Sequence, residues 1–161
     1  MNRPKIQRTI LGGFAGTLAM TTLMYTGPLL GFPKMDIAAM LGSMLGGSWW
    51  MGLMMHFING TIIFPLAFAY LFYAAVCARP WQKGMLWGLT LWSLAQVMVM
   101  PVMGMGFFSA HTPSPVTAVM GSLIGHLLYG VVLGVMGTAG TQQAAFCLPK
   151  AQMPAPTKAK P

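Results

Sequence analysis

The chain has 161 residues, of which 56% are hydrophobic, only 6% are charged and a single one is acidic. Soluble domains carry about 25% charged residues, so this chain lacks the charge to cover a water-exposed surface. The composition therefore excludes a soluble enzyme and a disordered protein, and it predicts one integral membrane domain over residues 1–148. The remaining stretch, 149–161, is rich in proline, alanine and lysine and is predicted to be a flexible cytoplasmic tail.

Four apolar blocks are each long enough to cross a hydrocarbon core of about 30 Å as a helix. They cover residues 9–30, 49–77, 84–106 and 116–140. The predicted fold is accordingly an all-α, up-down bundle of four transmembrane helices that contacts the lipid bilayer. Pro65 and Pro101 are expected to kink the second and third helices, because proline frees a carbonyl one turn earlier.

The connection between the first two blocks predicts a short helix of its own over residues 36–46. Asp36 is a suitable N-cap, and apolar residues follow it with the i, i+3, i+4, i+7 spacing of an amphipathic helix. We expect this helix to lie in the outer interface, with its small-residue face against a neighbouring helix or a partner subunit.

The nine basic residues of the chain predict its orientation. Eight of them border one side of the predicted bundle, and only Lys34 lies on the other. By the positive-inside rule, both termini are cytoplasmic, as in a protein of a bacterial inner membrane. Because these charges flank apolar blocks and form no groove, a nucleic-acid partner is excluded, and the expected partners are other membrane subunits or a second copy.

Two histidines lie in similar surroundings in the second and fourth helices. Each has a small residue four positions before it and a glycine four positions after it. The two sets are Gly52, His56, Gly60 and Ser122, His126, Gly130. Gly16 precedes the first histidine by 40 positions, and Gly88 precedes the second by 38. This similarity predicts two repeated helix pairs, with both histidines at the same depth.

In an up-down bundle the second and fourth helices are diagonal, about 11–14 Å apart. Two imidazoles across that gap suit the axial positions of one b-type haem, and the small residues beside them would leave room for the macrocycle. Asn59 and Tyr129, one turn further inward, would orient an imidazole or bond across the interface. The spacing of a small residue four before a histidine also resembles the local pattern by which light-harvesting helices ligate bacteriochlorophyll magnesium.

These features predict a small, non-catalytic subunit or carrier of a membrane electron-transfer assembly with a haem b cofactor. A purely structural subunit is the first alternative, because intramembrane histidines and small-residue stripes also join helices. The second is a protein handling Cu(I) or a small solute, using a methionine cluster and a nearby histidine as soft ligands. That cluster consists of Met98, Met100, Met103, Met105 and His111. With a single acidic residue, no paired-carboxylate or Ser-His-acid catalytic set exists, so no enzymatic activity is expected.

Overall fold

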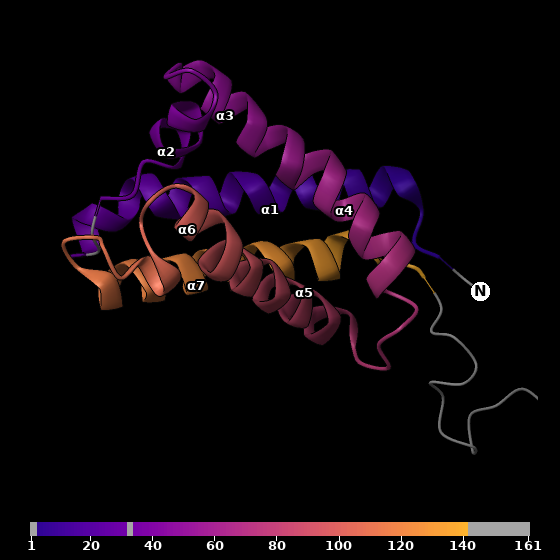
Figure 1. Ribbon diagram of the computed structural model, residues 1–161. Helices are drawn as coiled ribbons and strands as arrows, with labels where there is room; N and C mark the ends of the chain where they lie inside the picture. The colour runs from indigo at the N-terminus through magenta and orange to yellow at the C-terminus, as the bar shows by residue number, and fades with distance from the viewer. Residues whose placement is uncertain (1–2, 32–33, 142–161) are drawn as a thin grey trace, which may run out of the picture.

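The computed structural model describes residues 3–31 and 34–141, and within these ranges it contains helices and no strand (Figure 1). Three continuous helical segments are long and apolar enough to cross a membrane. They run over Trp49–Phe72, Pro80–Val102 and Pro115–Gly137. The prediction of an all-helical membrane protein is confirmed at this level, while the predicted tail 149–161 lies outside the described residues.

The observed helices follow the predicted blocks, with shifted ends. The chain forms α1 (Ile6–Thr26), a 3₁₀ turn (Gly27–Leu30), α2 (Ile37–Met44), α3 (Trp49–Ile58), α4 (Phe64–Ala67), α5 (Pro80–Leu94), α6 (Met100–Val102) and α7 (Pro115–Gly137). The first helix ends earlier than predicted because Gly27-Pro28 begins the 3₁₀ turn. The third begins earlier because Pro80 occupies the first helical position, which proline favours, and the Gln82 side chain accepts from the Arg79 N–H at 3.0 Å.

Wide π-helical turns precede both intramembrane prolines. Asn59–Ile63 joins α3 to α4 just before Pro65, and Ala95–Val99 joins α5 to α6 just before Pro101. Proline has no N–H and its ring clashes with the carbonyl four residues earlier, so the backbone widens by one residue per turn there. The predicted effect of the two prolines thus takes the form of π-turns, which leave carbonyl groups free for other partners.

Helix α7 packs along both α1 and α5 through glycines (Figure 1). A Cβ atom at Gly84 of α5 would collide with the carbonyl of Gly130, and one at Gly12 of α1 would lie 2.7 Å from the nitrogen of Gly137. Such close backbone contact is the usual means of helix association in a membrane. The segment α3–α4 crosses this layer diagonally and meets α1 where Gly60 faces Thr17.

The short helix α2 forms where it is predicted, over Ile37–Met44. The side chain of Asp36 accepts from the N–H of Ala39 at 3.0 Å, as expected of an N-cap. Its small-residue face packs on α3 of the same chain, where a Cβ at Gly52 would collide with the carbonyl of Ala38. Part of its apolar face covers an internal cavity.

One helix contact occurs in equivalent form in both halves of the chain. In each, the glycine four positions after the histidine meets the preceding long helix: Gly60 meets Thr17 of α1, and Gly130 meets Gly84 of α5. The repeat of two helix pairs nevertheless stays a prediction, because α1 also packs along α7 and is not one of the three described segments that are long and apolar enough to cross a membrane.

Candidate ligand-binding cavity

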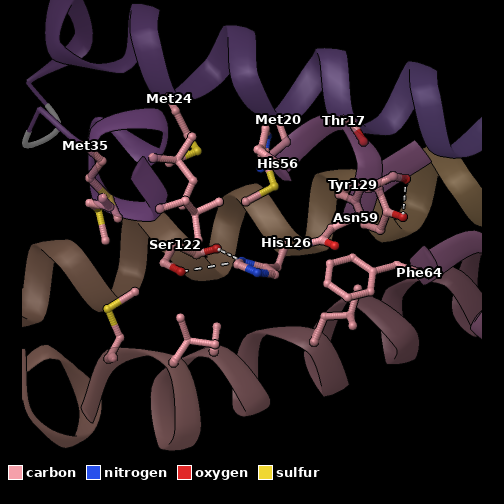
Figure 2. Close-up of a pocket in the computed structure, with 18 of the residues that line it drawn as sticks. Thr17, Met20, Met24, Met35, His56, Asn59, Phe64, Ser122, His126 and Tyr129 are labelled. Atoms are coloured by element: carbon pink, nitrogen blue, oxygen red, sulfur yellow. Dashed lines mark hydrogen bonds between the residues drawn. The ribbon is translucent and has the colours of Figure 1, made fainter. Parts of the chain in front are cut away.

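A cavity of about 140 Å³ lies between α1, α2, α3, α7 and the end of the Pro80–Val102 segment (Figure 2). Both histidines of the repeated pattern, His56 and His126, line it. Four further residues predicted for the site also line it: Asn59, Gly60, Ser122 and Tyr129. The fold therefore brings together, from α3 and α7, the two side chains on which the functional prediction depends.

His126 is held by its own helix. Its Nδ1 lies 2.8 Å from the backbone carbonyl of Ser122 and 3.5 Å from the hydroxyl of the same residue. A carbonyl oxygen only accepts hydrogen bonds, so Nδ1 carries the hydrogen, and the neutral ring has its lone pair on Nε2. No described residue bonds Nε2, which is the arrangement that a metal-ligating histidine requires.

His56 is held from the neighbouring helix α1. Its Nε2 lies 3.0 Å from Oγ1 of Thr21, whose hydroxyl donates to the carbonyl of Thr17 at 2.7 Å. Because the hydroxyl has one hydrogen, it accepts from Nε2–H of the imidazole. A ligand that binds Nε2 of His56 must therefore break this bond, whereas Nε2 of His126 is already free.

Tyr129 forms part of the cavity wall and joins α7 to the segment that follows α3. Its hydroxyl donates to the carbonyl of Gly60 at 2.8 Å, and the side chain is only 3% exposed. In the π-turn a carbonyl accepts from the N–H five residues later, as the carbonyl of Asn59 accepts from the N–H of Phe64. The carbonyl of Gly60 would therefore need the N–H of residue 65, which is proline and has none. Of the two predicted roles of Tyr129, the structure shows the bond across the helix interface. That bond satisfies a carbonyl that Pro65 leaves without a backbone donor.

Two predicted glycines serve helix contacts. Gly52 packs against Ala38 of α2 and Gly130 against Gly84 of α5, and neither lines the cavity. Gly60 does both, because it lines the cavity and meets Thr17. The space beside the histidines is bordered mainly by thioether and aliphatic groups.

Methionines form much of the cavity wall. Six line it: Met20, Met24, Met35, Met40, Met100 and Met103. Of the predicted methionine cluster, Met100 and Met103 are thus in place, whereas Met98 is 60% exposed and Met105 lines a second pocket. His111 lies on an exposed loop, where Nδ1 is 3.2 Å from the carbonyl of Gly104.

Sequence reasoning missed several residues of the site. Thr21, which bonds His56, and the α1 methionines were not singled out. A weak signal existed in the spacing of Met20 and Met24, which places both on one face of α1. The approach of Met20 and Met24 to His56, which lies 36 and 32 positions further along, depends on helix packing.

Within residues 3–31 and 34–141, no charged side chain lines this cavity, and no group of three His, Cys, Asp or Glu is placed to hold a metal ion. The single acidic side chain lies outside the cavity, just before α2, where Asp36 accepts from Ala39 N–H, from the Tyr25 hydroxyl at 2.9 Å and from the Trp49 indole at 3.0 Å. The Ala39 N–H, followed by the other donors and Lys34, holds the pKa of Asp36 below its ordinary value.

Residues 4–146 match a protein family described as a family of unknown function (DUF6789). The match covers most of the chain, so the chain belongs to this family. No curated protein and no solved structure matches the chain.

Proposed function

We propose that this member of the DUF6789 family is a small, non-catalytic integral membrane subunit or carrier of an electron-transfer assembly, which holds a b-type haem between His56 and His126. The observation that supports the proposal best is that these imidazoles, 70 residues apart in the sequence, line one interior cavity. His56 and His126 would hold the haem iron through their imidazoles, and a haem held in this way would supply one-electron transfer.

The two histidines would enter such a site by different steps. His126 has its Nε2 lone pair available, because Ser122 fixes the hydrogen on Nδ1. His56 must first release Thr21, which keeps its own bond to Thr17 and so leaves no hydroxyl hydrogen unpaired. The methionine and aliphatic walls would exclude water and hold a neutral, low-dielectric environment around the iron.

In this proposal, α1 is the fourth membrane span. It runs antiparallel to α7 with close contacts along its length, from Gly12 at one end to Met20 near Gly125 further along. Its threonines lower its hydropathy, but Thr17, Thr21 and Thr26 each donate to the carbonyl four residues earlier. Polar groups satisfied within the helix are compatible with a bilayer.

Basic side chains gather where both termini of the bundle lie, and we assign this end to the cytoplasmic side of a bacterial inner membrane. Arg8 donates to the carbonyl of Ala139 beyond α7, and Arg3 lies over the ring of Tyr70. The buried ammonium of Lys83 donates to the carbonyl of Tyr73 at 2.8 Å. A reporter enzyme that is active only in the cytoplasm should therefore be active when it is fused to either terminus.

The proposal is tested by the visible spectrum of the full chain, purified after expression with ample haem. We expect a Soret band and a sharp α band after dithionite, both lost in H56L and in H126L. His111 provides the matched control, because it is an exposed loop histidine outside the cavity, so H111L should keep both bands.

Absence of a Soret band from folded wild-type protein would refute haem binding and favour the alternative of a structural subunit. In that case the two histidine substitutions would alter assembly or stability alone. Retention of the bands in H56L and H126L would place any haem elsewhere and refute the assigned ligands.

A further inference from the structure

A second pocket, of about 380 Å³, lies at the outer end of the molecule, between the start of α2, the loop after α6 and the start of α7. Four methionines line it: Met35, Met40, Met100 and Met105. The first three also line the histidine cavity, so the two hollows adjoin across a boundary made of thioether side chains.

The loop that carries Met105 is fixed by hydrogen bonds. The N–H of Met105 donates to the carbonyl of Met100 at 2.9 Å, and the N–H of His111 donates to the carbonyl of Met105 at 2.9 Å. Deeper in the loop, the hydroxyl of Ser109 donates to the buried side chain of Gln96 at 3.1 Å. Met105 is thereby held at the pocket wall opposite the start of α2.

Packing alone does not account for these methionines. Methionine commonly fills irregular gaps in a core, but here the thioethers border a gap that stays open. Met100 is 5% exposed, while Met35, Met40 and Met105 are partly exposed beside the pocket. Flexible side chains at the edge of an open hollow can converge on a ligand without disrupting a packed core.

The lining of the pocket also restricts the ligand class: besides the four methionines it includes Lys34, whose ammonium has no lone pair for a metal ion, and Asp36. Asp36 is the one acidic side chain of the whole chain, and its oxygens already accept bonds from Ala39, Tyr25 and Trp49. Divalent ions such as Mg²⁺ and Ca²⁺ need several carboxylate or carbonyl oxygens. Neutral thioethers instead suit Cu(I), a soft ion with a single charge.

We propose that this outer pocket is a Cu(I) site whose ligands are the thioethers of Met35, Met40, Met100 and Met105. The site differs from the cluster predicted by sequence proximity, because Met98 is exposed elsewhere, Met103 lines only the inner cavity and His111 lines neither pocket. Its ligands include neither His56 nor His126, although Met35, Met40 and Met100 also line the histidine cavity.

The test is anaerobic titration of the full chain in detergent with Cu(I), in competition with a chromogenic Cu(I) chelator. We expect one tightly bound equivalent, and an affinity at least tenfold lower in M100L/M105L and in M35L. M98L is the matched control, from the same segment but outside both pockets, and should bind like the wild type. Circular dichroism shows which variants are folded, and M35L, at a partly exposed position, tests the site without disturbing the buried Met100.

The H56L/H126L variant separates this site from the histidine cavity. We expect it to keep the bound equivalent, and X-ray absorption of the Cu(I) form to show sulfur neighbours without nitrogen. Failure of the wild type to compete for Cu(I), equal affinity in the methionine variants, or loss of binding in H56L/H126L would each overturn the proposal.

Discussion

Replacing Tyr129 by phenylalanine should destabilise the fold because it leaves the carbonyl of Gly60 without a donor. A buried unpaired acceptor costs about 1–3 kcal/mol, whereas interhelical hydrogen bonds measured in membranes average about 0.6 kcal/mol and reach about 1.7. The average measured in membranes is lower because a polar group that loses its partner there usually finds another hydrogen-bond partner. Here Pro65 removes the backbone alternative, so we expect the upper part of the membrane range, about 1–1.7 kcal/mol. Reversible unfolding in mixed micelles, followed by circular dichroism, gives this free energy.

Pro65 provides the decisive second variant. In P65A the residue gains an N–H that can reach the Gly60 carbonyl, so Y129F should cost less than half as much in that background. Y70F is the matched control, because Tyr70 is 42% exposed and keeps its ring beneath Arg3, and its effect should stay within about 0.5 kcal/mol. If Y129F is as neutral as Y70F, or equally costly with and without Pro65, the explanation of this bond is wrong.

Three further outcomes can be measured. In G130A the new Cβ meets the backbone of α5, so the free energy of unfolding should fall by about 1–3 kcal/mol, while G121A, whose Cβ has only a methionine sulfur at 3.6 Å, should be near neutral. The lowered pKa of Asp36 contributes stability that is present above its ordinary value of 3.8 and is lost as the pH falls through the lower folded value. Trp49 fluorescence should therefore change below about pH 4 in the wild type and not in D36N, and an unchanged wild-type signal would contradict this coupling. T21V removes the bond that haem must break, worth about 0.5–1.5 kcal/mol, so haem should bind about two- to tenfold more tightly; weaker binding in a spectral titration would show that the hydroxyl assists the ligand.

The hydrogen bonds around Asp36 illustrate a prediction that local sequence allowed. An N-cap depends on a side chain and a backbone N–H three residues apart, so Asp36 and the start of α2 could be read directly from the chain. The additional bonds from Tyr25 and Trp49 could not, because they join α1 and α3 to that cap across separate elements.

The methionines show the opposite case. Proximity in the sequence grouped Met98 with Met100, yet residues two positions apart in a helix point to nearly opposite sides, and the structure separates the two. Met35 and Met40, more than 50 positions away, take the place of Met98. Ligand sets built from several helices depend on how those helices cross, which no local pattern contains.

The sequence by itself determined an all-helical membrane protein, the approximate helix ends and the prolines that distort two helices, because hydropathy, capping and the missing proline N–H act within a few residues. It also singled out two histidines with matched neighbours. Only the tertiary structure decided that both histidines line one cavity, that Thr21 forms a hydrogen bond with His56 and that Tyr129 donates a hydrogen bond to the carbonyl of Gly60. These are contacts between helices. They depend on which helices meet at their glycines, and that is set by the packing of the whole chain.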